Sequence, residues 1–165
     1  MAWLVWVESW SASVWVRESG SLWSYPTVLF LHTVGLAFAV GMSAVIALRV
    51  LGAASAMPLP PLDRFYQVLW LGFWVNAASG TALLIADATT KMINPVFYIK
   101  MVCVVLAMIA TTRIRRALRD QSSGIRPISH LNKALAVASL VLWTGAILAG
   151  RLMAYIGPVS GVDVS

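Results

Sequence analysis

Four long apolar stretches, separated by short polar or proline-rich segments, set the pattern of this chain. They run over about residues 26–50, 65–87, 95–112 and 133–156. A helix needs about 20 apolar residues to cross the hydrocarbon core of a bilayer, and each stretch is about that long. The pattern therefore predicts an all-α integral membrane protein whose four spans form a helical bundle.

Residues that start and stop helices support these limits. Pro26 and Pro95 fit the first turn of a helix, where the missing N–H is not needed. The segment Met57-Pro58-Leu59-Pro60-Pro61 separates the first two spans, and Gly157-Pro158 closes the last one. Because no linker interrupts the series, we expect residues 1–165 to form a single transmembrane domain.

The N-terminal segment, about residues 2–18, has a different pattern. Trp3, Val7, Trp10 and Val14 recur at helical spacing, while charged residues and serines interrupt the run. Tryptophan favours the headgroup region, so the spacing predicts an amphipathic helix lying at the membrane interface. A cleaved signal peptide is the competing interpretation, but the segment lacks the basic start and continuous apolar core of such peptides.

The composition agrees with lipid as the solvent. Only 11% of the 165 residues are charged and 60% are hydrophobic, with a mean hydropathy of +0.83. A soluble domain has roughly 25% charged residues. The formal net charge of +6 could suggest nucleic acid. However, most basic residues lie in one short stretch between spans, without interleaved aromatic residues, so we expect no nucleic-acid partner.

The distribution of basic residues predicts the orientation. Cytoplasmic loops of membrane proteins carry an excess of lysine and arginine. Eight of the 12 Lys and Arg residues flank the first or third loop between spans, namely Arg49, Arg64, Arg113, Arg115, Arg116, Arg119, Arg126 and Lys133. We therefore expect a protein of the bacterial inner membrane with both termini outside.

Each span contributes an ionisable residue at nearly the same depth. His32 lies about six residues inside the outer end of the first span, Asp87 ends the second, and Lys100 lies about five residues into the third. Arg151 and Tyr155 lie near the outer end of the fourth. Small residues share faces with these side chains, as in the series His32, Gly35, Ala39, Ser43 and the series Lys100, Cys103, Ala107, Thr111. Such faces mark helix contacts or room for a flat ligand.

Each of these residues also has a purely structural interpretation. His32 could form a hydrogen bond to a hydroxyl or carbonyl of another helix, and Lys100 could extend to the interface. Asp87 could be a solvated helix end, and Arg151 with Tyr155 could anchor the interface. His130 lies beside the third loop, on the wrong side to join the cluster.

A histidine held in a helical bundle is a common axial ligand for haem iron. His32 is therefore the candidate metal ligand, and Lys100, Arg151 and Tyr155 are candidate partners for the haem propionates. Since no second histidine lies at this depth, the other axial position would be empty or filled by water, Lys100 or a partner chain.

Two motifs resemble the CopD/HemJ-like superfamily of small bacterial membrane proteins. His32-Thr-Val-Gly35-Leu36 resembles the first core helix of that family, and Phe97-Tyr98-Ile99-Lys100-Met101 resembles its helix with a lysine near the start. In HemJ-type members a histidine and a lysine bind haem b, which implies the same role for His32 and Lys100. The chain lacks the further aromatic, proline and histidine residues of the HemJ-type oxidases, so the resemblance favours haem binding over oxidase activity.

We therefore expect an integral membrane protein that binds haem b and transfers electrons, with a quinone or a redox subunit as its partner. A homo-oligomer or a larger membrane complex is expected, since the chain has no soluble domain. Two alternatives stay open: a cofactor-free structural or assembly subunit, and a copper or proton pathway through His32 and Asp87. Hydrolytic chemistry has no support, because no nucleophile–base pair or carboxylate pair is visible.

Overall fold

The computed structural model describes residues 6, 8–19, 21, 23–53, 61–122, 129–153 and 155, and within them every regular element is a helix. The helices are α2 (Ser11–Glu18), α3 (Tyr25–Leu51), α4 (Pro61–Ala86), α5 (Ala88–Met92), α6 (Pro95–Ser122) and α7 (His130–Leu152). The prediction of an all-α bundle is confirmed. The breaker segment 57–60 and the closing pair Gly157-Pro158 lie outside the described residues.

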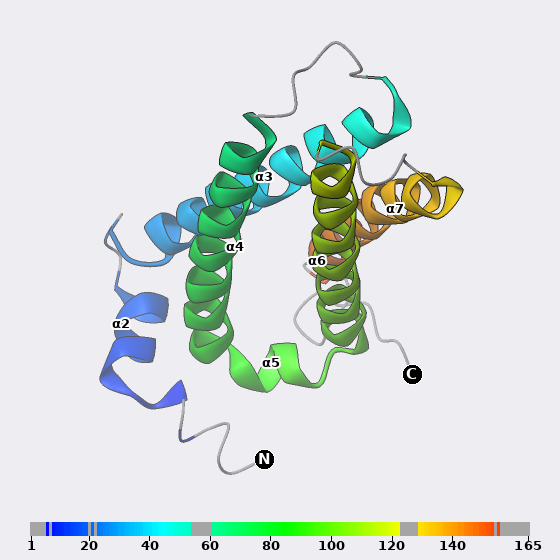
Figure 1. Cartoon of the computed structure of the whole chain (residues 1–165). Coiled ribbons are helices and arrows are strands. Elements are labelled where there is room, and N and C mark those ends of the chain that lie inside the picture. Colours follow the sequence, from blue (N-terminus) through cyan, green and yellow to red (C-terminus); the bar gives the residue numbers. More distant parts are fainter. Residues whose placement is uncertain are drawn as a thin grey trace.

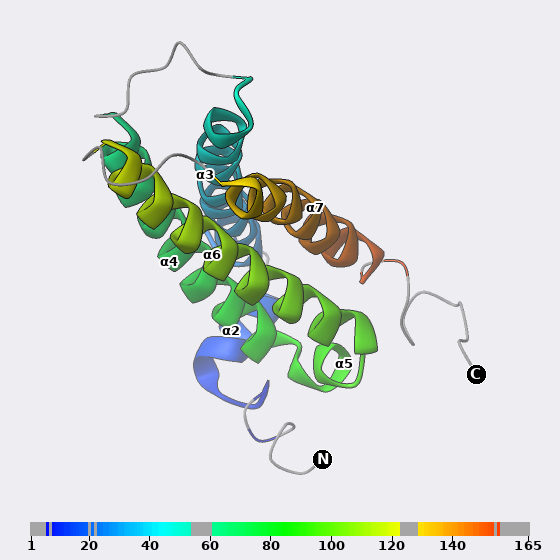
Figure 2. The same cartoon turned by 45° about the vertical axis from the view of Figure 1, so that its right-hand side comes forward.

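The four long helices form two layers. In Figure 1, α4 and α6 stand in front, and α3 and α7 lie behind them, while Figure 2 shows α7 beside α6. Helix α3 contacts α4, α6 and α7, and α6 packs along α7. The short α5 joins α4 to α6 at the end of the bundle where α2 also lies (Figure 1). We call this end the α5 end and the opposite end, which carries Arg113, Arg116 and Arg119, the arginine end.

Helices α3 and α4 touch backbone to backbone. A Cβ atom built on Gly35 would lie 2.6 Å from the backbone nitrogen of Asn76 and 2.8 Å from the carbonyl oxygen of Gly72. Small residues permit this close approach, which is a common way of packing helices where lipid removes the hydrophobic driving force. The contact fixes α4 beside the residues of α3 that precede and follow Gly35.

Three hydroxyl groups and an indole join α3, α6 and α7 in the core. The Oγ of Ser43 lies 2.7 Å from the Oγ1 of Thr111 and 3.2 Å from the Oγ of Ser139, and it accepts a 2.8 Å hydrogen bond from the Nε1 of Trp143. All four side chains are buried. In an apolar interior each polar group needs a partner, and this cluster provides one for every member.

Toward the arginine end, an aromatic residue joins α4 to α6. The guanidinium of Arg115 lies 3.8 Å from the ring centre of Tyr66, and the Tyr66 hydroxyl lies 3.3 Å from the Oγ1 of Thr112. Trp70 and Phe73 extend this row of rings along α4 and pack against the core. The arginine end of the α4–α6 layer is therefore held by side-chain contacts.

The outward faces of the long helices are apolar. Phe30, Leu71 and Val141 are 65%, 67% and 64% exposed. Four helices are long and apolar enough to cross a membrane, and faces of this kind would be unfavourable in water. The chain is a multi-pass membrane protein.

Several helix limits differ from the sequence prediction. Helix α6 continues to Ser122 rather than residue 112, because its terminal arginines are good helix formers and suit the negative end of the helix dipole. Helix α7 starts at His130 because the Ser129 hydroxyl accepts a hydrogen bond from the Asn132 N–H. Helix α5 was not predicted. The single interfacial helix expected over residues 2–18 is interrupted by non-helical residues at Ser9 and Trp10, and part of it lies outside the described residues.

Candidate functional site

A cavity of about 400 Å³ opens at the α5 end, between the helices of both layers. The polar residues that line it include His32, Asp87, Thr90, Lys91, Asn94 and Lys100. Leucines, Phe97 and Met153 form much of the remaining wall. Residues of α3, α4, α5, α6 and the end of α7 therefore meet here, and the expected gathering of His32, Asp87 and Lys100 is observed.

The hydrogen bonds of His32 indicate which of its ring nitrogens carries the proton. Its Nδ1 lies 3.0 Å from the backbone carbonyl oxygen of Asn76, and 3.3 Å from the Oγ of Ser79. Because a carbonyl oxygen can only accept, Nδ1 must carry the proton. In the neutral ring the lone pair is then on Nε2, the nitrogen that could bind a metal.

Asn76 and Gly80 hold the imidazole against α4. The Nδ2 of Asn76 donates a 2.7 Å hydrogen bond to the backbone oxygen of His32 and lies 3.3 and 3.4 Å from the two ring nitrogens. Gly80 leaves room for the ring itself, since a Cβ there would be 2.8 Å from Cε1. The interpretation of His32 as a hydrogen-bonded bundle histidine is therefore confirmed for Nδ1.

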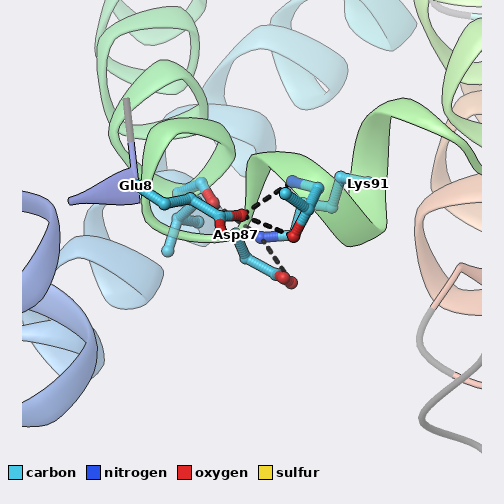
Figure 3. A network of polar contacts seen from close by, with 5 residues as sticks. Glu8, Asp87 and Lys91 are labelled. Carbon is cyan, nitrogen blue, oxygen red and sulfur yellow. Dashed lines mark hydrogen bonds and ion pairs between the residues drawn. The ribbon is translucent and has the colours of Figure 1, made fainter. Parts of the chain in front are cut away.

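Lys91 is tied to the end of α4. Its Nζ donates a 2.6 Å hydrogen bond to the carbonyl oxygen of Leu83 and lies 3.7 Å from the Oδ2 of Asp87 (Figure 3). Carbonyls in the last turn of a helix lack helical partners, and a cation there is favourable. Burial lowers the pKa of Lys91, and the Asp87 carboxylate partly opposes this effect.

Glu8 fixes the start of α5 from a distant part of the chain. Its Oε1 accepts hydrogen bonds from the backbone N–H of Thr89, at 2.7 Å, and from the Thr89 hydroxyl, at 2.8 Å (Figure 3). A carboxylate at a helix N-terminus satisfies a free N–H and suits the helix dipole. Glu8, which precedes α2, thus stabilises the start of α5, and we call α5 the rim of the cavity.

Asn94 starts α6 and also lines the cavity. Its Oδ1 accepts a 2.9 Å hydrogen bond from the Val96 N–H, and Pro95 occupies the first helical position. Sequence analysis missed Asn94, Lys91 and Glu8. The Asn94-Pro95 pair and the four-residue spacing of Asp87 and Lys91 were the available signals for the first two.

Among the residues that the structure describes, Lys100 has no comparable partner. It is half-buried and lines the cavity, and it makes no hydrogen bond or ion pair with any side chain in the described ranges. Gly150 of α7 lies beside it, since a Cβ there would be 3.7 Å from the Cε and Nζ of Lys100. The two lysines of the cavity therefore differ. Lys91 is bonded to α4, whereas Lys100 can bind a ligand.

The structure places the other two predicted cofactor residues elsewhere. Arg151 is exposed and Tyr155 is 68% exposed, and neither lines the cavity. The buried face of α7 carries Trp143, Ala146 and Ala149 instead. This placement suits interface anchors, and the assignment of Arg151 and Tyr155 to a cofactor stays a prediction.

The described residues do not form a metal site with several protein ligands. Within them, no group of three or more histidine, cysteine, aspartate or glutamate residues could hold a metal. His130 is exposed at the arginine end, as the sequence predicted. A single imidazole with the lone pair on Nε2, which has the Asn76 Nδ2 at 3.4 Å, suits a metal that brings most of its own ligands, as a tetrapyrrole does.

The cavity combines an oriented imidazole, a lysine that has no hydrogen-bond or ion-pair partner among the described residues, and apolar walls in a membrane bundle. The resemblance to the CopD/HemJ-like superfamily stays a prediction. No protein-family model, curated protein or solved structure matches this chain.

Proposed function

We propose that this protein binds a b-type haem in the cavity at the α5 end, with the Nε2 of His32 as an axial ligand, and transfers electrons. The observation that carries the proposal is the 3.0 Å contact between the Nδ1 of His32 and the Asn76 carbonyl. A metal-binding histidine commonly donates its other N–H to a carbonyl, which fixes the ring and makes the ligating nitrogen more basic.

The cavity has properties that suit such a cofactor. Its volume of about 400 Å³ lies within the range of small-molecule and cofactor sites. Leu29, Leu84 and Phe97 offer apolar contacts to a macrocycle, while Lys100 offers a cation. When bound, haem supplies one-electron chemistry, and the residues of this chain hold it, orient it and limit the access of water.

The resemblance to the CopD/HemJ-like superfamily adds support, since it implies haem binding at His32 and Lys100. Water, Lys100 or a partner chain would supply any further ligand to the iron. A membrane-embedded electron carrier needs a donor and an acceptor. We therefore propose a quinone or a redox subunit as partner, in a homo-oligomer or a larger complex.

The arginines of α6 support an orientation for the protein in the membrane. Helix α6 has 28 residues and is about 42 Å long, so it extends past a hydrocarbon core of about 30 Å at its arginine end. The positive-inside rule places that end in the bacterial cytoplasm. The cavity and both termini would then face outward. A cysteine at Ser122 in a Cys103→Ser background should resist labelling from outside intact cells, and ready labelling would reverse the orientation.

The haem proposal is tested with purified protein from cells supplied with iron. We expect an intense Soret absorption in the wild-type protein, its loss in His32→Ala, and its retention in His130→Ala, which removes the exposed histidine of the arginine end. Circular dichroism and gel filtration would establish that the variants fold. A folded, colourless wild-type protein would exclude the proposal.

The second candidate function is a cofactor-free structural or assembly subunit. It is favoured by the hydrogen bonds of His32 to α4, which already satisfy one ring nitrogen without a ligand. In that case His32→Ala should lower stability without changing the absorption spectrum. Copper transport has weaker support, since the described residues hold no multidentate metal group.

A further inference from the structure

Lys91 and Lys100, the two lysines of the cavity, differ in their protein partners, and this difference indicates what kind of ligand the cavity takes. Lys91 donates to the Leu83 carbonyl at 2.6 Å and has Asp87 nearby at 3.7 Å. Lys100 lines the same space without a hydrogen bond or ion pair to the residues that the structure describes. Asp87, the acidic residue of the cavity wall, therefore already pairs with Lys91, and its side chain is 44% exposed.

An ammonium group without a counter-ion is unfavourable in a membrane cavity. Ionisable residues inside transmembrane segments generally pair with an opposite charge or face a substrate pathway. Lys100 is half-buried on the membrane-spanning helix α6, and its surroundings include Phe97 and Gly150. An anion entering the cavity would satisfy Lys100 without disturbing the pair formed by Lys91 and Asp87.

We propose that the cavity is a receptor for the acid group of an amphiphile, in which the Nζ of Lys100 pairs with a carboxylate or phosphate oxygen. The apolar wall, which includes Leu29, Leu83 and Phe97, would hold the body of the ligand. If the ligand is haem, the acid group is a propionate, and this identification rests on the proposed function. The recognition of an acid by Lys100 does not, because it needs no metal and no contact with His32.

The same geometry explains why Lys100 rather than Arg151 is assigned this role. Arg151 is exposed and lies outside the cavity wall, where water or lipid headgroups can solvate it. Gly150, its neighbour in the chain, lies beside the Lys100 side chain, since a Cβ built there would be 3.7 Å from the Nζ. Both Gly150 and Lys100 line the cavity, so the ammonium lies where an acid group in the cavity would meet it.

Iron-free protoporphyrin IX and its dimethyl ester test the proposal without the iron–histidine bond. Fluorescence titration in a non-ionic detergent should show that the wild-type protein binds the diacid at least about tenfold more tightly than the ester, as expected for a charge-assisted hydrogen bond. Lys100→Met should remove this preference. Lys133→Met, which removes an exposed lysine at the arginine end, should retain it.

A second arm distinguishes a porphyrin acid from a lipid acid. Dodecanoate and dodecyl phosphate, compared with dodecanol, should bind with the same dependence on Lys100 if the natural ligand is a lipid-like amphiphile. Equal binding of acids and neutral analogues by the wild-type protein would overturn the proposal, and so would a Lys100→Met variant that keeps the acid preference. A wild-type protein without a Soret band in the earlier experiment would instead count against haem alone.

Discussion

Gly80 of α4 lies directly against the imidazole of His32 on α3. A Cβ atom at position 80 would be 2.8 Å from the Cε1 and 3.2 Å from the Nδ1 of the ring. Separations below about 3 Å require movement, and a shift of the ring would alter its 3.0 Å contact with the Asn76 carbonyl. The position of the candidate iron ligand therefore depends on a glycine of another helix.

Gly80→Ala should displace the imidazole. We expect a loss of about 1–3 kcal/mol in the free energy of unfolding, as for other overpacked sites, together with a loss of haem absorbance per mole of protein. Gly41→Ala is the matched control, since a Cβ at Gly41 meets nothing within 4 Å. Denaturant unfolding and Soret absorbance check both effects. A Gly80→Ala protein with wild-type stability would show that the ring is not held as described.

The hydroxyl cluster of the core predicts that two similar substitutions, Ser43→Ala and Thr144→Ala, differ in their effect on stability. Ser43→Ala removes the acceptor of the Trp143 Nε1–H and a partner of Thr111 and Ser139. A buried group left without a partner costs about 1–3 kcal/mol, so the variant should lose that much stability. Thr144→Ala should lose almost none, because Thr144 is exposed and bonds only to its own helix at Leu140.

Unfolding of both variants can be followed through far-UV circular dichroism, because the chain has eight tryptophans and its fluorescence would not report Trp143 alone. The expected signal for Ser43→Ala is a midpoint at lower denaturant concentration with an unchanged slope. Equal midpoints for Ser43→Ala and Thr144→Ala would mean that the cluster contributes no net stability.

Helical periodicity was sufficient to predict which faces of α3 and α6 are buried. Gly35, Ala39 and Ser43 follow His32 at steps of three and four residues and are all buried, because a close helix contact selects small residues on one stripe. The same holds for Ala107 and Thr111 after Lys100. The sequence therefore predicted the meeting of His32 and Lys100 at one end.

The rim of the cavity could not be predicted in this way. Helix α5 has five residues, too few for a periodic pattern, and its start is fixed by Glu8, which is 81 positions away from Thr89 in the chain. The structure also places Arg151 outside the cavity, although the sequence grouped it with His32 and Lys100. It is exposed, since alanines and Trp143 form the buried face of α7.

The environment of Lys91 predicts how stability depends on pH. Burial lowers the pKa of its ammonium in the folded protein, although Asp87 partly opposes this effect. Between the lowered pKa and the ordinary lysine pKa, the unfolded chain therefore binds more protons than the folded one. In that interval the free energy of unfolding should rise with pH, because the folded state no longer has to keep a buried charge.

Comparison with Lys91→Met isolates this contribution. The variant loses the bond to the Leu83 carbonyl, so it should be less stable than wild type near neutral pH. At alkaline pH below the ordinary lysine pKa, its unfolding free energy should rise less steeply than that of wild type. Lys133→Met, which alters an exposed lysine, should keep the wild-type slope. Parallel curves for wild type and Lys91→Met would show that Lys91 titrates normally in the folded protein, and that the α5 rim is open to water at this lysine.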